Sequence, residues 1–493
     1  MVTLDAMGRR SLALPLLWTL AACAYPLPPD RAGPDLRGWP DDVDWNRAGR
    51  EASQVLAGYL RQDTRNPPGN ETVGATYLAH VLRREGIPSE IVEYAPGRGS
   101  LIARLEGSGK QRPLCLLSHI DVASAESPGD WPGGKGPLSG TIDANGMIWG
   151  RGALDMKGMG VLELLTLVWL KRLQVPLERD VILLAVADEE VDNRGMQFVM
   201  QRHFARLGCS HMVNEGGLGL KDALFKGQTV FAISVAEKGV LWLRVVARGA
   251  SGHGSTPRPG QAPMRLIQAL TRIARRVPKP AVHPTLEQLF ARVGRQHGGV
   301  AGVVLQRPAL VRTLVLDRLM RQPGTRAALI DTVNITVLDT GGNQPNVVPG
   351  RATATLDIRL LPGSRPAAVI DELRQLVHDP GIQFEQLSYW PSLQSPQDDP
   401  LFRALARQAV AGRDDAVAGP VLSIGFTDSL FARRAGVRAY GLVPFEVTEQ
   451  EASTMHGVGE RVSVANMRRG LRVLLSAVLE VSADLRARRP KRK

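Results

Sequence analysis

Helix-forming and strand-forming segments alternate between residues 48 and 235, and this alternation restricts the chain to few architectures. Amphipathic helices are predicted at 46–62 and 71–86, and an apolar helix at 157–173. Apolar runs that fit buried strands occur at 100–105, 113–118, 181–187 and 211–214. Alternation of this kind predicts a mostly parallel sheet covered by helices.

A different order of segments follows over 237–392. Four strands and two helices are predicted in the order β-α-β-β-α-β, which is typical of a ferredoxin-like α+β unit. Residues of about 277–330 interrupt this order with a helical insertion. From 393 to 485 the chain returns to helix–strand alternation. We therefore predict a first domain made of 46–236 and 393–485, with the second domain inserted into it.

The composition is that of an ordinary globular protein, with 44% hydrophobic and 22% charged residues. A chain of 493 residues should form two or three domains. Much of the net charge of +13 lies in a basic tail, residues 486–493, which contains six basic side chains. Most such tails are solvated. Because the sequence shows no helix-turn-helix, zinc-knuckle or aromatic-stacking pattern, we expect no nucleic-acid partner.

The first 45 residues are predicted to export and tether the protein. Arg9 and Arg10 precede an apolar run at 12–22, which is too short to span a bilayer comfortably and fits the core of a signal peptide over 1–22. The run ends in LAAC, which resembles the bacterial lipoprotein processing box and would make Cys23 the lipidated first mature residue. A Pro-rich tether follows over 23–45. We expect lipid anchoring in the bacterial cell envelope, in the periplasm or at the outer membrane; an unprocessed hydrophobic anchor is the alternative.

Two further cysteines are far apart in the sequence. Cys115 lies in the predicted strand 113–118 and is expected to be a small buried hydrophobic residue. Cys115 and Cys209 are not expected to form a disulfide framework, even in an oxidising compartment.

Three of the predicted strands end in side chains that bind metals. These side chains are His119 and Asp121 after the second strand, Asp188, Glu189 and Glu190 after the third, and Glu215 after the fourth. Asp155 lies in a Gly-rich loop, and His456 lies near the C-terminus. The carboxyl ends of parallel strands meet at one edge of a sheet, so these groups should lie close together. So many carboxylates repel one another unless a cation binds among them, although any one alone would be an ordinary capping or surface residue.

The ligand types are oxygen and imidazole without thiolate, which suits Zn²⁺, with Co²⁺ or Mn²⁺ as alternatives. Two histidines and three carboxylates exceed the three protein ligands of a typical catalytic zinc. They fit two ions about 3.5–4 Å apart, bridged by one carboxylate. Glu189 and Glu190 are neighbours, so a regular strand cannot aim both at one ion. One is expected to bind metal and the other to act as a base.

Five motifs, in their order along the chain, resemble the co-catalytic zinc exopeptidases, which include aminoacylase, carboxypeptidase G and succinyl-diaminopimelate desuccinylase. The motifs are SHIDVAS, GRGALDMKG, ADEE, NEGG and MHGVGERV. SGHGSTP, NVVPGRATATLDIRLLPG and GFTDSLFARRAG extend the resemblance, which covers roughly 50–480. The chain is most similar to the carboxypeptidase S branch, which includes the N-fatty-acyl amino acid hydrolase. This family implies a mostly parallel-sheet catalytic domain with an inserted ferredoxin-like lid and dimerisation domain.

The resemblance also implies two zinc ions per chain. The ligands would be His119 and Glu215 for one ion, Glu190 and His456 for the other, and Asp155 between them. A cis peptide bond is implied between Asp155 and Met156. The motifs depart from the family in SHID, where GHxD is commoner, and at Gly459, where Asn or Asp is frequent; neither change removes a ligand.

The same resemblance assigns roles in catalysis. Glu189 would be the general base, taking a proton from a metal-bridging water and delivering it to the leaving amine. Asp121 would orient the ring of His119. His253 would hold the oxyanion.

Substrate binding is assigned in the same way. Asn346 and Arg359 would form a clamp in which the guanidinium grips a free carboxylate, and Gly425 to Asp428 would line the specificity pocket. In dimeric relatives the histidine corresponding to His253 reaches the neighbouring subunit's metals, so we expect a homodimer.

The expected function is that of a zinc metallocarboxypeptidase or N-acyl amino acid amidohydrolase, acting on small peptides or N-acyl amino acids. One alternative is a catalytically inactive binding protein on the same fold. Others are a dipeptidase or deacylase of a different substrate class, and an anchored interaction module that uses the basic tail.

Overall fold

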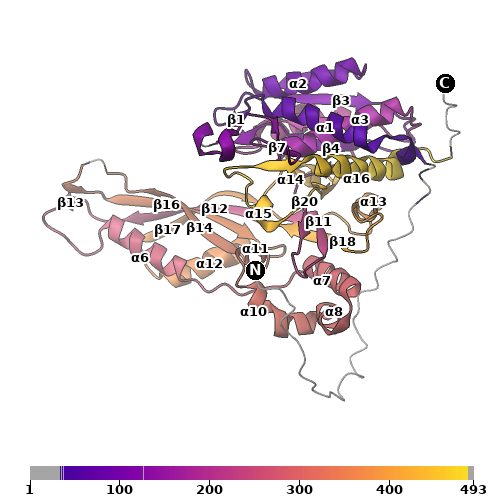
Figure 1. The fold of residues 1–493 in the computed structure, drawn as a ribbon. Helices are drawn as coiled ribbons and strands as arrows, with labels where there is room; N and C mark the ends of the chain where they lie inside the picture. Colours follow the sequence, from indigo (N-terminus) through magenta and orange to yellow (C-terminus); the bar gives the residue numbers. More distant parts are fainter. Residues whose placement is uncertain (1–33, 35, 37, 126, 343, 487–493) are drawn as a thin grey trace, which may run out of the picture.

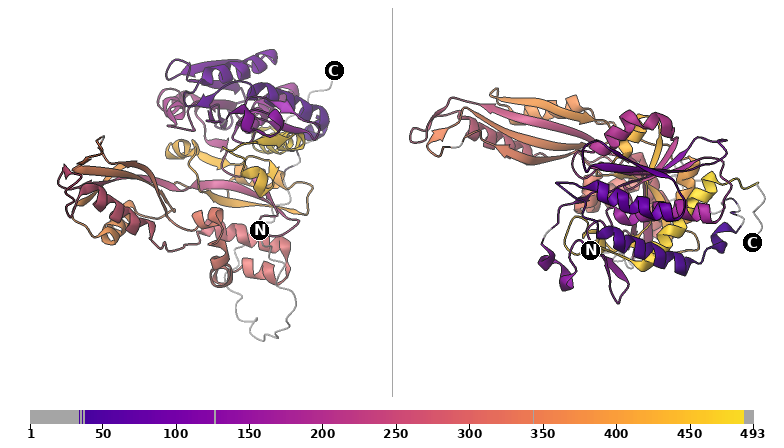
Figure 2. Two further views of the ribbon diagram at one scale, coloured as in Figure 1. Left: turned by 60° about the vertical axis from the view of Figure 1, so that its left-hand side comes forward. Right: turned by 90° about the horizontal axis from the view of Figure 1, so that it is seen from above.

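The computed structural model describes residues 34, 36, 38–125, 127–342 and 344–486. The predicted signal peptide, Cys23, most of the tether and the basic tail beyond residue 486 lie outside these residues. The described part forms a large α/β body from which a smaller unit projects (Figures 1 and 2).

Ten strands form the main sheet of the body. They are β2 (Ser89–Glu93), β3 (Gly99–Leu105), β4 (Leu114–His119), β8 (Val181–Val186), β9 (His211–Asn214), β10 (Gly219–Lys221), β11 (Thr229–Glu237), β18 (Ala416–Ser423), β19 (Arg438–Gly441) and β20 (Glu446–Val447). Their order is β2-β3-β8-β4-β9-β19-β11-β10-β20, with β18 beside β11. The central strands β8, β4, β9 and β19 are parallel, which confirms the predicted fold class.

Helices cover both faces of this sheet, which explains why its central strands are apolar throughout. Along β4, Leu114 and Leu116 pack into the core with α1 (Trp45–Leu60), α3 (Lys157–Arg172) and α16 (Val464–Ser482). The alternate residues Cys115 and Leu117 pack on the opposite face with α4 (Arg194–Arg202) and α14 (Ser429–Arg434). The strands are thereby fixed from both sides, and their ends hold a defined position.

The remaining elements of the body are short or peripheral. They are η2 (Trp39–Asp42), β1 (Arg65–Asn66), α2 (Glu71–Arg84), β5 (Val122–Ala123), η3 (Pro128–Asp130), η4 (Pro132–Gly134), β6 (Thr141–Ile142), β7 (Met147–Trp149), α5 (Phe204–Leu207), α13 (Pro400–Ala409), α15 (Glu449–Ala452) and β21 (Arg461–Ser463). Helix α1 begins where the Asp44 carboxylate accepts hydrogen bonds from the backbone of Asn46 and Arg47. Helix α2 ends just before Gly86, whose positive φ of 67° suits glycine.

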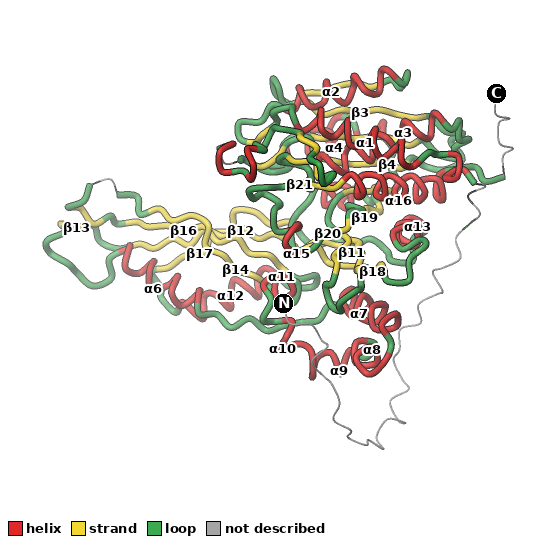
Figure 3. The backbone as a smooth tube through the Cα atoms, viewed as in Figure 1, coloured by secondary structure: helices red, strands yellow, loops and turns green. Residues whose placement is uncertain are grey.

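The smaller unit contains a separate antiparallel sheet. Its long elements are β12 (Gly239–Arg248), α6 (Ala262–Ala274), β14 (Thr332–Asp339), β16 (Arg351–Leu360), α12 (Pro366–Val377) and β17 (Ile382–Trp390). The strand order is β14-β16-β12-β17, with every neighbouring pair antiparallel, as in a ferredoxin-like unit. Helices α6 and α12 bury one face of the sheet in a core of its own. A short pair, β13 (Gly252–His253) and β15 (Val347–Val348), lies at the end farthest from the body (Figure 3).

The interruption between α6 and β14 is helical, as predicted. It contains α7 (Pro284–His297), α8 (Gly299–Leu305), α9 (Pro308–Leu310), the π-helical turn Val311–Val315, α10 (Leu316–Leu319) and α11 (Pro323–Ala327). Helix α7 packs on β18 of the body. Within the described ranges no single helix is long and apolar enough to cross a membrane. The helices Gly299–Leu305 and Pro308–Leu319 are long and apolar enough only when they are counted as one segment, and the chain bends by 96° between them.

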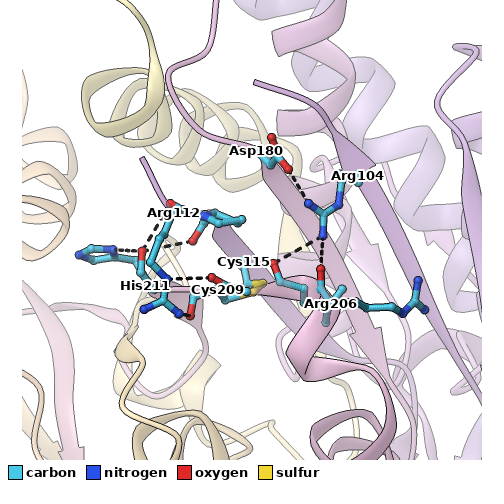
Figure 4. The surroundings of a disulfide bond; sticks show 11 residues. Arg104, Arg112, Cys115, Asp180, Arg206, Cys209 and His211 are labelled. Atoms are coloured by element: carbon cyan, nitrogen blue, oxygen red, sulfur yellow. Dashed lines mark hydrogen bonds and ion pairs between the residues drawn. A yellow bond between two sulfur atoms is a disulfide. The ribbon is translucent and has the colours of Figure 1, made fainter. Parts of the chain in front are cut away.

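Cys115 and Cys209 form a disulfide, so the expectation that Cys115 is simply a small buried hydrophobic residue outside any disulfide framework is wrong (Figure 4). Cys115 lies in β4, and Cys209 comes shortly before β9, which pairs with β4 in parallel. This pairing brings the two Cα atoms to 5.9 Å although 94 residues separate them in sequence. The neighbourhood of the strands, rather than any local spacing, determines the bond.

Candidate metal centre

The predicted metal ligands converge at one edge of the main sheet. His119 is the last residue of β4, Glu190 follows β8, and Glu215 follows β9. The loop before α3 contributes Asp155, and the segment after α15 contributes His456. Three of the five ligands end or follow parallel strands, whose carboxyl ends lie at the same edge of the sheet. Residues far apart in the sequence meet there for this reason.

Asp155 lies between the two histidines. His119 Nε2 is 3.1 Å from Asp155 Oδ1, and His456 Nε2 is 3.1 Å from Asp155 Oδ2. On the outer sides, His119 Nε2 is 3.7 Å from Glu215 Oε1, and His456 Nε2 is 3.1 Å from Glu190 Oε2. Each histidine thus faces one oxygen of a shared carboxylate and one carboxylate of its own.

The loop that carries Asp155 is held in place by residues of a C-terminal segment. The Asp155–Met156 peptide bond is cis, as predicted. Glu460 is buried, and its Oε1 accepts hydrogen bonds from the backbone of Leu154 at 2.8 Å and of Asp155 at 3.2 Å. Its other oxygen pairs with Arg151 at 2.9 Å. Glu460 lies in the motif MHGVGERV, but no pattern in the sequence indicates this contact with Leu154, 306 residues earlier.

Asp121 contacts His119 differently from the expectation. His119 Nδ1 lies 2.8 Å from the backbone carbonyl oxygen of Asp121 and 3.7 Å from its carboxylate. The carboxylate instead accepts hydrogen bonds from the backbone N–H groups of Glu189 and Glu190, at 3.0 and 3.1 Å. Asp121 therefore orients the histidine through its main chain and the Glu189–Glu190 turn through its side chain.

The charges at this edge are poorly compensated by the protein itself. Burial raises the pKa of Glu189 well above its ordinary value, and the charge of Glu215 raises it further. Burial raises the pKa of Glu215 in the same way, with Asp155 adding to it. Hydrogen bonds to Asp155 and Glu190 raise the pKa of His456 to about 10. Repelling carboxylates beside two imidazoles form a donor set that fits divalent cations, zinc above all.

Three of the substrate-binding and catalytic residues predicted from the sequence belong to the smaller unit and not to the sheet edge that carries the metal ligands. His253 is exposed in β13 and contacts Ser255 Oγ through Nδ1 at 2.8 Å. Asn346 lies beside it, since its carbonyl accepts a hydrogen bond from Gly254 at 2.7 Å. Strand β13 is at the end of the smaller unit farthest from the body, so the structure does not bring these two residues to the metal ligands of the same chain (Figure 1). Arg359, near the end of β16, forms a two-pronged pair with Asp357 at 2.8 and 3.0 Å.

Gly425 lies in the exposed loop after β18, and this loop leads to two buried residues near the metal ligands. Thr427 donates a hydrogen bond to Glu237 at 2.6 Å, where the main sheet passes into the smaller unit. Asp428 accepts a hydrogen bond from Asn193 at 3.1 Å, and burial raises the pKa of Asp428 to about 8. The loop is therefore fixed both to the junction with the smaller unit and to the segment after Glu190.

The sequence matches the model of peptidase family M20/M25/M40 over residues 115–480. Human N-fatty-acyl-amino acid synthase/hydrolase PM20D1 is 28% identical over 416 residues, which cover 82% of this chain and 80% of the human protein. Aminoacylase-1 from Sus scrofa is 28% identical over 434 residues, covering 86% of this chain and 94% of the pig protein.

Solved structures share the fold. The M20 family metallo-carboxypeptidase Sso-CP2 from Sulfolobus solfataricus superimposes with a TM-score of 0.65 at 18% identity, covering 87% of this chain and 99% of that one. Human carnosine dipeptidase 1 gives a TM-score of 0.61 at 16% identity, covering 91% and 99%. Sequence motifs, ligand geometry and family match agree, and the chain belongs to peptidase family M20/M25/M40, a family of metal-dependent hydrolases.

Proposed function

We propose that this hydrolase uses two metal ions to cleave an amide bond next to a free carboxylate, in N-acyl amino acids or at the C-terminus of small peptides. The observation that carries the proposal is the position of Asp155, whose two oxygens each face a different histidine at 3.1 Å. A carboxylate placed in this way is a bridging ligand for a pair of ions rather than a ligand of one.

The cations would be zinc, or alternatively cobalt or manganese. Bound here, they would polarise the substrate carbonyl and lower the pKa of a bound water molecule. His119 and Glu215 would hold one ion, and Glu190 and His456 the other. Glu189 lies with His119 and Glu215 in one group of potential ligand atoms within 4.8 Å. Its carboxylate is therefore placed beside the proposed ions, where it would accept the proton of the attacking water and pass it to the leaving amine.

Two relatives and one side chain support this substrate class. Human PM20D1 is an N-fatty-acyl-amino acid synthase/hydrolase, and the pig relative is an aminoacylase. Arg359 could recognise the carboxylate that these compounds share, by exchanging its pairing with Asp357.

The test is a hydrolysis screen of N-acyl amino acids and dipeptides, with and without a chelator. Each compound is matched with its carboxyl-amidated form. We expect turnover of the free acids, loss of turnover with chelator, and recovery with zinc. A chain that binds these compounds but hydrolyses none would be the inactive binding protein, and equal turnover of the amidated forms would exclude the carboxylate requirement.

We also propose that two copies share their active sites. Strand β14 is an edge strand of the smaller sheet, and Leu338 on it is 66% exposed. Helix α6 packs beside β14 and exposes Ile267 to 55%. An unpaired strand edge next to exposed apolar side chains favours pairing with a second copy. Such pairing would give His253 and Asn346, which are remote from the metals of their own chain, a partner site to act on.

Leu338→Arg is expected to convert the dimer to a monomer, because it places a charge in the proposed interface. Leu314→Arg is the matched control, since Leu314 is exposed on the helical insertion instead. Size-exclusion chromatography with light scattering measures the mass of each. If both variants keep the mass of the unchanged protein, the interface does not include β14.

Mixing two inactive variants tests the shared site. His253→Ala and Glu189→Gln are dissociated, mixed and reassociated, and some mixed dimers then carry one intact site. We expect activity to return to the mixture but not to either variant treated alone. If mass spectrometry shows mixed dimers and activity stays absent, His253 does not act across the interface.

A further inference from the structure

A second group of buried carboxylates lies behind the proposed metal ligands. Glu71 and Asp121 are completely buried, and Asp188 is 3% exposed. Their oxygens lie within 4.8 Å of one another, a spacing that could also hold a cation. Three buried negative charges at this spacing would be strongly unfavourable without compensation.

The protein supplies its own cation at this place. The guanidinium of Arg98 contacts Glu71 at 2.6 and 2.7 Å and Asp188 at 2.6 Å. Gly69, with φ at 79°, allows this approach, because a Cβ there would lie 2.4 Å from Arg98 Cζ. Arg98 also donates to the carbonyl of Pro68 at 3.1 Å, in the same loop.

Asn66 connects this group to the metal ligands. Its single amide nitrogen, Nδ2, donates to Asp121 Oδ2 at 2.9 Å and to Asp188 Oδ1 at 2.8 Å. Asp121 holds the turn that carries the proposed ligand and base, and Asp188 directly precedes these two residues in the chain. Asp121 accepts from the backbone of Glu189 and Glu190, and its carbonyl faces His119.

We propose that Asn66 and Arg98 are positioning residues of the metal centre, which set the place of His119, Glu189 and Glu190 through Asp121 and Asp188. The inference rests on the proposed two-metal function. An ion pair that served stability alone would not need Asn66 to donate hydrogen bonds to both Asp121 and Asp188. It would also not need the hydrogen bonds that connect Asp121 to His119, Glu189 and Glu190. The group Glu71–Asp121–Asp188 accordingly binds arginine rather than a third metal ion.

Asn66→Asp tests this inference with almost no change in shape. It removes the two donated hydrogen bonds and adds a negative charge beside two others. We expect zinc affinity, measured by competition with a chromophoric chelator, to fall about 10–100-fold, the usual effect of losing a group that orients ligands. The kcat should fall in the same range while KM changes less than about threefold, because the substrate is not contacted. Asn145→Asp, at an exposed position, is the matched control and should change neither quantity.

Arg98→Lys and Arg98→Met separate charge from structure. Lysine keeps the positive charge and should retain more zinc affinity than methionine, even if both lower the melting temperature. If Arg98→Met does not fold, Asn66→Asp and Arg98→Lys still decide. Unchanged zinc affinity in Asn66→Asp, or a loss of melting temperature alone, would overturn the inference. Zinc affinity is read without substrate, so failure of the proposed hydrolysis would be seen separately, as an inactive unchanged protein that still binds zinc.

Discussion

Glu189→Gln is expected to lower kcat by about 10²–10⁴-fold while the protein still binds two zinc ions. The substitution keeps the size of the side chain but removes the carboxylate that accepts the proton of the attacking water. The proposed ligands stay in place, because Glu189 is held through its backbone by Asp121. Steady-state kinetics on the best N-acyl amino acid, together with metal analysis of the same sample, measures both quantities.

The matched control is Glu106→Gln, an exposed glutamate of the same body, which should leave both kcat and zinc content unchanged. Two results would count against the role of Glu189 as base. One is a variant with near-normal turnover, and the other is loss of zinc in parallel with activity, which would make Glu189 a ligand instead.

Asp155→Ala is expected to remove binding of both ions and to abolish turnover. Asp155 is the one carboxylate that faces both histidines, so its loss separates two half-sites that each retain a single histidine. The effect on zinc affinity should exceed the 10–100-fold loss typical of residues that only orient ligands. Metal content by mass spectrometry after dialysis against a weak chelator is the direct measurement.

Asp130→Ala, at an exposed position, is the control for this experiment. A variant that keeps one ion at full affinity would show that Asp155 belongs to one site only. Retention of two ions would exclude it as a ligand altogether, and the bridging geometry would then need another explanation.

Much of the fold and of the candidate centre could be predicted from the sequence. Strands buried on both faces have continuous apolar runs, and such runs are easy to recognise before His119 or Asp188. Parallel strands meet at one edge, so the groups that follow them had to converge. The loop before α3 and the segment with His456 could be added because the motifs resemble a family.

Contacts that depend on the arrangement of distant segments could not be predicted. The disulfide depends on β4 and β9 being neighbours, and nothing near Cys115 or Cys209 in sequence indicates it. Asn66 lies in the short strand β1 and Arg98 in the loop before β3, neither of them in a metal-binding pattern, and their role follows from a turn around Gly69. A polar residue next to consecutive prolines, as in NPPG, is the signal that could have drawn attention to Asn66.

The order of the main sheet has a consequence for synthesis of the protein. Strand β19 lies between β9 and β11, yet the ribosome makes it only after residues 239–390, which form a unit with its own core. A nascent chain therefore holds β9 and β11 without the strand that joins them, and lacks His456 while the four other proposed ligands have emerged. Long-range pairing of this kind is completed late. Closure of the sheet and the final geometry of the proposed metal centre therefore both require the C-terminal part of the chain.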